Sequence, residues 1–190
     1  MANKIEICNK ALAALGAAPI VSITEESSEA KRLNQIWDMS LEGVLREYPW
    51  NFALATVELA QTANKPPDFT YEYQLPSDSL YVVEIISPSL GRDYTEYKVR
   101  GTTLVTDEST VCIEYVKVVD DSARFDSLFA EALAWYLASQ LAAAITGDSA
   151  LGQRMAGAYA LALSKARGMN GNESRRSLLH NSKLVQSRKG

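Results

Sequence analysis

One segment constrains the fold of this chain more than any other. From Asp126 to Thr146 the residues favour a helix, and between 130 and 145 only Glu131, Ser139 and Gln140 interrupt the apolar and small side chains. A helix that is apolar around nearly its whole circumference must be buried on most sides. Either other elements of the chain or a neighbouring copy must pack around it, and the sequence leaves both arrangements open.

Three further segments have the period of an amphipathic helix. Residues 4–15 repeat apolar side chains at helical spacing, and Gly16 follows where a left-handed cap is favoured. A second apolar stripe runs from the possible N-caps Ser27 and Ser28 to Pro49. Residues 149–167 form the third stripe, after a turn at Gly147. We therefore predict four helices, over residues 4–15, 29–48, 126–146 and 149–167.

The period changes between residues 51 and 118. Runs of β-branched and aromatic residues occupy 71–75, 81–86, 97–99 and 111–116, and prolines and glycines separate them. This pattern predicts an antiparallel meander of short strands. The chain is therefore expected to be an α+β protein, in which about four helices pack with a small antiparallel sheet in one domain over residues 1–168.

The charge of the chain is unevenly distributed. The formal net charge is −4, which gives no general attraction to nucleic acid or to an anionic membrane. Residues 169–190 nevertheless hold five Lys or Arg and one Glu. We interpret them as an extended basic tail that docks on a partner, although a solvated end without a specific role has the same composition. The candidate docking residues are Arg175, Arg176, Leu178, Leu179, Lys183, Leu184, Val185, Arg188 and Lys189.

The residues needed for common catalytic and metal sites are scarce. The only histidine, His180, lies in the tail, whereas a catalytic imidazole must be held rigidly beside its nucleophile. Cys8 and Cys112 are far apart in sequence and sit in apolar patterns, so we expect small core residues rather than zinc ligands. No catalytic residue, cofactor site or metal site is predicted.

Carboxylates and tryptophans need separate consideration. Paired carboxylates can hydrolyse glycosides without histidine, but acidic residues next to helix starts usually stabilise the helix N-terminus. The carboxylates concerned are Glu25, Glu26, Glu29, Asp120 and Asp121. The tryptophans fall on helical faces or at a helix exit, where core packing is the simpler interpretation than ligand stacking. They are Trp37, Trp50 and Trp135.

The order of motifs along the chain resembles the tail tubular protein A family, the head-to-tail adaptors or connectors of short-tailed phages and prophages. The resemblance rests on the ordered series rather than on one diagnostic motif, and it covers almost the whole chain. Its parts are residues 7–16, 19–22, 30–48, the Glu47-Tyr-Pro-Trp-Asn-Phe52 segment, the Tyr71-Glu-Tyr-Gln-Leu-Pro76 segment with Asp78, and the alanine-rich helix pair that ends near Gly168.

This resemblance implies a structural protein of the virion neck or tail. Such adaptors form a ring of about twelve copies beneath the portal protein, extend the DNA channel and provide a platform for the next tail or nozzle protein. In related adaptors the C-terminal segment reaches along the portal, and residues 169–190 occupy that place here. The resemblance carries over no catalytic residue, and DNA is expected to pass through the channel without specific binding.

The expected cellular context follows from the N-terminus and from segment lengths. The N-terminus lacks the apolar run of a secretory signal, and no segment is expected to have the length of a membrane span. We therefore expect synthesis in the host cytoplasm and no membrane partner. The alternative functions are a virion-associated cell-wall hydrolase using paired carboxylates, another ring component of the neck or tail, and a nucleic-acid-binding factor acting through its basic tail.

Overall fold

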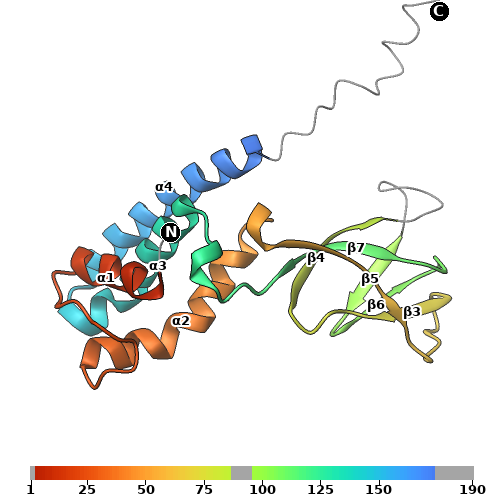
Figure 1. The fold of residues 1–190 in the computed structure, drawn as a ribbon, viewed down its shortest axis with the longest axis horizontal. Helices are drawn as coiled ribbons and strands as arrows, with labels where there is room; N and C mark the ends of the chain where they lie inside the picture. The colour runs from red at the N-terminus through yellow and green to blue at the C-terminus, as the bar shows by residue number, and fades with distance from the viewer. Residues whose placement is uncertain (1–2, 87–95, 174–190) are drawn as a thin grey trace, which may run out of the picture.

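The structure is a computed structural model, and it describes residues 3–86 and 96–173. Helices gather at one end of an elongated molecule and strands at the other (Figure 1). The helices are α1 (Lys4–Ala14), α2 (Ser28–Arg46), α3 (Ser127–Thr146) and α4 (Ser149–Glu173), with 3-10 turns at Asn51–Ala53 and Ser122–Arg124. The α+β class expected from the sequence is confirmed.

The described part of the chain holds seven strands between residues 54 and 117. They are β1 (Leu54–Glu58), β2 (Ala60–Gln61), β3 (Tyr71–Gln74), β4 (Ser79–Ile86), β5 (Tyr97–Arg100), β6 (Thr103–Thr106) and β7 (Cys112–Lys117). They form two antiparallel sheets, with strand orders β1-β7-β4 and β2-β3-β6-β5. The predicted meander is therefore wrong, because long-range pairings replace the neighbour-to-neighbour order that short turns would have produced.

The helix caps predicted from the sequence are present in the structure. The Ser27 side chain accepts a hydrogen bond from the backbone N–H of Ala30 and begins α2. Gly16 and Gly147 adopt the left-handed conformation, with φ of 69° and 71°. The first three helices have ends within two residues of those predicted, which is the ordinary spread at fraying helix termini.

The fourth helix differs from its prediction in length. We expected α4 to end at 167, but it continues through Gly168 to Glu173. The extra turns have partners: Arg167 pairs with the Glu47 carboxylate, and the buried Asn170 side chain binds the backbone of residues 49–51. These tertiary contacts offset the low helix propensity of glycine, so the sequence period alone placed the helix end too early.

Helix α3 lies at the centre of the helical end and contacts α1, α2 and α4. Its buried side chains include Phe129, Leu133, Leu137 and Leu141, which confirms the burial expected of an all-round apolar helix. By length and composition alone α3 could also cross a membrane, so the expectation that no segment has that length is wrong. Half of its apolar window is buried inside the protein, as is usual for a core helix.

An aromatic cluster joins the helical end to the strands. Trp50 is buried, and its indole N–H donates to the Val44 carbonyl oxygen at 3.1 Å. Its ring lies 5.1 Å from that of Phe129, and Phe52 lies 4.9 Å from the same ring. The Glu47–Phe52 motif therefore fixes the exit of α2 against the start of α3.

The three tryptophans differ in burial. Trp37 and Trp50 are core residues, as predicted, with 2% and 1% of their surface exposed. Trp135 is only half-buried, because it lies on a side of α3 that its neighbours do not fully cover. Cys8 is likewise a core residue, whereas Cys112 is half-buried at the start of β7.

Candidate functional site

The Cys8 thiol is not a reactive site. Both cysteines are free, and burial raises the pKa of the Cys8 thiol to about 12, although the nearby Lys4 ammonium acts in the opposite direction. A thiol with so high a pKa stays protonated at neutral pH and is a poor nucleophile and metal ligand. Among residues 3–86 and 96–173 no group of three His, Cys, Asp or Glu side chains is placed to hold a metal ion. His180 lies outside the described residues.

The carboxylates proposed for glycoside hydrolysis have local structural partners. Glu25 accepts a hydrogen bond from the Ser27 hydroxyl and others from the backbone N–H groups of Val21 and Ser22, and these bonds lower the pKa of its carboxyl. A general acid of a glycosidase needs the opposite, a raised pKa. Glu25 therefore organises the loop before α2.

The neighbouring carboxylates have similar local roles. Glu26 forms an exposed ion pair with Lys31, and Glu29 accepts a hydrogen bond from the Ser28 hydroxyl. Asp121 accepts from the backbone N–H of Ala123 and caps the 3-10 turn at 122–124. Each of these contacts lies within five residues of the carboxylate in sequence, so they support local turns and helix starts.

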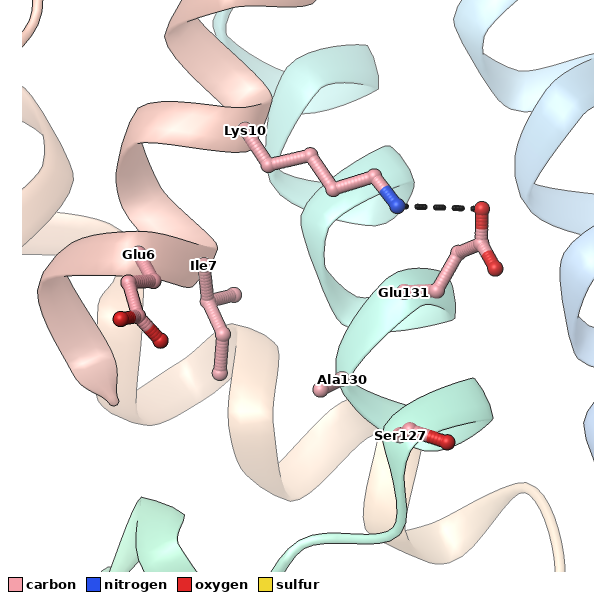
Figure 2. A pocket seen from close by; sticks show the side chains of 6 residues that line it. All are labelled: Glu6, Ile7, Lys10, Ser127, Ala130 and Glu131. Carbon is pink, nitrogen blue, oxygen red and sulfur yellow. Dashed lines mark hydrogen bonds and ion pairs between the residues drawn. The ribbon is translucent and has the colours of Figure 1, made fainter. Parts of the chain in front are cut away.

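A small hollow lies between α1 and α3 (Figure 2). Its lining consists of Glu6, Ile7, Lys10, Ser127, Ala130 and Glu131, and its volume is about 180 Å³. The Lys10 ammonium donates to a Glu131 carboxylate oxygen at 3.0 Å, and this hydrogen bond is the main cause of the lowered pKa of Glu131. Ligand pockets usually exceed about 300 Å³, and the hollow is therefore best described as a seam between two helices.

Two larger hollows lie at the strand end of the molecule. One, of about 540 Å³, is lined by the loop from Gln61 to Tyr71, and another, of about 450 Å³, lies between residues 74–79 and the turn at Gly101 and Thr102. The polar groups of their linings are mostly hydroxyls and amides. The ionisable lining residues are Tyr71 and the exposed Lys65. Neither brings together an acid and a base, so neither has the composition of a catalytic site.

Two helices of the described chain each carry one large apolar side chain that is exposed on their outer side. Leu161 on α4 is 77% exposed, and Met39 on α2 is 81% exposed. Each lies on the side of its helix that faces away from α3, because the buried residues of both helices point to the opposite side. Isolated exposed apolar residues are common, but here each occupies the centre of an otherwise uncovered helix face.

Two glycines share the outer face of α4 with Leu161. Gly157 and Gly168 lie within about 40° of Leu161 around the helix, and both are exposed. A Cβ atom added at either would meet nothing within 4 Å. Glycine inside a helix costs about 1 kcal/mol relative to alanine, and no contact among the described residues accounts for that cost.

The predicted docking residues of the tail all lie outside the described residues. They are Arg175, Arg176, Leu178, Leu179, Lys183, Leu184, Val185, Arg188 and Lys189. Two features of α4 were missed by sequence reasoning: its exposed outer face, and the buried Asn170 anchor at its end. Glycines at helical spacing beside Leu161 were a usable signal for the first, whereas nothing local in the sequence marks Asn170 as buried.

Comparison with models of known protein families and with curated protein sequences finds no match to this chain.

Proposed function

We propose that this protein is a structural head-to-tail connector subunit of a phage particle, which forms a ring beneath the portal, extends the DNA channel and presents a platform for the next tail or nozzle protein. The motif order described above supports this proposal, and so does the agreement between its expected α+β architecture and the four helices and antiparallel sheets. The ring of about twelve copies belongs to the same proposal.

One structural observation supports ring formation most directly. Leu161 and Met39 lie on two different helices and are both largely exposed. A closed ring joins each copy to its neighbours through two different patches, whereas a two-fold dimer uses one patch twice. A ring therefore needs two different contact patches, and the outer faces of these two helices are candidates for them.

An acidic sheet face suits a channel through which DNA slides. By strand register, Glu114 on β7 and Glu58 on β1 project from the same face, one row apart. Carboxylates repel the phosphate backbone, whereas lysine and arginine would hold it in a salt-dependent way. We propose this face as a candidate for the channel wall, and a map of the assembled ring with Lys and Arg in its place would contradict that assignment.

The test is to mix the purified protein with its cognate portal protein and to examine the mixture by size exclusion and electron microscopy. A variant ending at Glu173 tests the basic tail. A variant ending at Gly168 would be unsuitable, because it would also lack Asn170 and its contacts to residues 49–51. We expect the full chain to add a ring to the portal and the shortened chain to lose that ability.

Either outcome is informative. If the shortened chain still adds a ring, the connector role stands and the docking role of residues 174–190 fails. If the full chain does not bind the portal but binds the tail-tube protein, the protein belongs elsewhere in the neck or tail. A cleared zone on a cell-wall zymogram would favour the hydrolase instead.

A further inference from the structure

We propose that Asn170 is a site of spontaneous deamidation, and that the contacts at the end of α4 control when the reaction occurs. Asn170 is followed by Gly171 in the last turn of α4, and this is the only Asn-Gly pair in the sequence. The backbone nitrogen that follows an asparagine can attack the asparagine side chain. Glycine hinders this attack least because it has no Cβ atom, so Asn-Gly is the asparagine pair that deamidates most readily.

The reaction needs only the chain and water. The Gly171 nitrogen forms a bond to Cγ of Asn170, the bond from Cγ to Nδ2 breaks, and ammonia leaves with the proton of the Gly171 N–H. Water then opens the resulting cyclic imide at either of its carbonyl carbons. The product is aspartate, or isoaspartate, in which the main chain runs through the former side chain. In sum, the side-chain amide is hydrolysed to a carboxylate and ammonia.

Packing against Tyr48 favours glycine at position 171. A Cβ atom added to Gly171 would lie 3.2 Å from the Tyr48 hydroxyl oxygen, which is closer than ordinary van der Waals contact. The Tyr48 ring packs edge-on against the buried Trp50, with 5.4 Å between the ring centroids. It therefore has little room to move away from a larger side chain. The reactive Asn-Gly pair is thus a consequence of the close approach of α4 to the exit of α2.

The closed end of α4 protects Asn170 from this reaction. Its side chain is held by the Asn51 N–H at 3.0 Å and by the Pro49 carbonyl oxygen at 3.5 Å. The Asn51 side-chain amide also donates to the Asn170 carbonyl oxygen at 3.3 Å. Gly171 lies within α4, where the backbone N–H takes part in the helix hydrogen bonds. Attack on Cγ requires these bonds to break and the side chain to turn toward the next nitrogen.

The end of α4 is where local opening is expected. Helix ends fray more readily than helix interiors, and such opening does not require the whole protein to unfold. Asn170 is the one buried residue among 168–173, so few contacts hold this turn besides its own. The observed rate should equal the rate in an open chain multiplied by the fraction of time that the helix end is open. The pair between Arg167 and Glu47 lowers that fraction.

Deamidation would change the helix end. Aspartate at position 170 has no N–H to donate to the Pro49 carbonyl oxygen, and a carboxylate near a helix C-terminus is opposed by the helix dipole. Isoaspartate adds a carbon atom to the main chain, so the helical hydrogen-bond register cannot continue through it. Either product should loosen the turn from which residues 174–190 leave. If those residues dock on the portal, modified subunits should add a ring less well; this consequence rests on the proposed function.

The first experiment incubates the purified full chain in mildly alkaline buffer and follows deamidation by mass spectrometry of tryptic peptides. Asn170 and Asn172 lie on the same tryptic peptide, residues 168–175, so fragment ions compare them in one sample. Asn172 precedes Glu173 and is the internal control. We expect Asn170 to convert to aspartate and isoaspartate well before Asn172 changes. Conversion of Asn170 should be at least about 10-fold faster in urea, where the helix end is permanently open.

The second experiment changes the contacts of the helix end and leaves the Asn-Gly pair intact. Glu47→Ala removes the partner of Arg167 and should speed conversion of Asn170 about 2- to 5-fold, the factor expected from a largely exposed ion pair. The matched control is Glu26→Ala, which removes the exposed pair with Lys31 at the opposite end of α2. This variant should leave the rate unchanged. Thermal melting confirms that both variants are folded.

A third variant tests the packing of Gly171. Gly171→Ala together with Tyr48→Phe removes the hydroxyl that the new Cβ atom would approach and keeps the ring beside Trp50. The double variant should fold and should convert Asn170 more slowly than the unmodified chain, in urea as well as in buffer. Tyr48→Phe alone should deamidate at the unmodified rate in urea, since the Asn-Gly pair is still present.

The outcomes separate this inference from the proposed function. If Asn170 in the folded chain converts no faster than Asn172, the modification site is overturned. If its rate is the same in buffer and in urea, or if Glu47→Ala does not change it, control by the helix end is overturned. All these measurements use the isolated chain, so a failure to form a ring on the portal would refute the connector role and leave the deamidation site standing.

Discussion

The Asn170 anchor at the end of α4 allows a quantitative test of the fold. Asn170 is 7% exposed, and its Oδ1 accepts a hydrogen bond from the backbone N–H of Asn51 at 3.0 Å. Its amide nitrogen donates a longer bond, 3.5 Å, to the Pro49 carbonyl oxygen. Asn170→Ala removes both interactions and leaves the main chain of α4 unchanged.

The expected loss of stability in Asn170→Ala is the difference between a lost hydrogen bond and a gain in helix propensity. A partly buried backbone N–H that loses its acceptor costs about 1–3 kcal/mol, and the long bond to Pro49 adds little. Alanine gains about 0.6 kcal/mol of helix propensity over asparagine. The free energy of unfolding should therefore fall by about 1–2 kcal/mol. Asn172→Ala is the matched control. Asn172 is exposed on the same helix, so this variant gains helix propensity and loses no buried hydrogen bond.

Urea unfolding followed by circular dichroism measures both variants. With an m-value of about 2 kcal/mol per M, Asn170→Ala should lower the midpoint by roughly 0.5–1 M. Asn172→Ala should leave it unchanged or raise it slightly. If the two variants had the same midpoint, the contacts of Asn170 would not be what holds the helix beyond Gly168, and the explanation given for its length would be refuted.

Three further predictions follow from the described surfaces. Gly168→Ala should raise the free energy of unfolding by up to about 1 kcal/mol, because a Cβ atom there meets nothing within 4 Å, as measured by urea unfolding. Cys8, with its pKa near 12, should react with a thiol reagent at pH 8 only after denaturation. Any thiol reaction of the folded chain should come from Cys112 and should be lost in the Cys112→Ser variant. Glu131→Gln should cost at most about 0.5 kcal/mol, because the Lys10 pair is largely exposed. The pair lowers the pKa of the Glu131 carboxyl below its ordinary 4.5. Its contribution to the free energy of unfolding should therefore be present above pH 4.5 and be lost as the pH falls through the lowered pKa, as urea unfolding at several pH values would measure.

Local signals in the sequence were sufficient for the fold class and for most helix ends. Ser27, Gly16 and Gly147 act through side-chain or backbone chemistry that depends on a few neighbouring residues, so their positions predict the caps directly. Strand pairing is different. The β1–β7 ladder joins residues more than fifty positions apart, and the short runs between 51 and 118 do not specify which partner each strand takes.

The candidate surfaces were predictable only in part. Local residue types were enough to doubt a catalytic role for Glu25, because acidic residues near helix starts usually serve the helix. Leu161 lies outside the apolar stripe predicted for residues 149–167, about 100° around the helix from Ala162, so its exposure agrees with the helical period. The period alone does not say how far α4 rotates against α3; in the structure Leu163, Ala166 and Asn170 are buried and Leu161 lies on the opposite side of the helix.

The all-round apolar α3 bears on where a neighbouring copy can bind. Helices α1, α2 and α4 of the same protomer pack around it. Exposed residues near its C-terminal end are small, such as Ala143 and Ala144. Helix α4 differs because it buries only Leu163, Ala166 and Asn170 and leaves its other side open. Core stability therefore constrains the inner side of α4 but not the outer side. Leu161 and its flanking glycines lie on this outer side, where packing among the described residues does not constrain them.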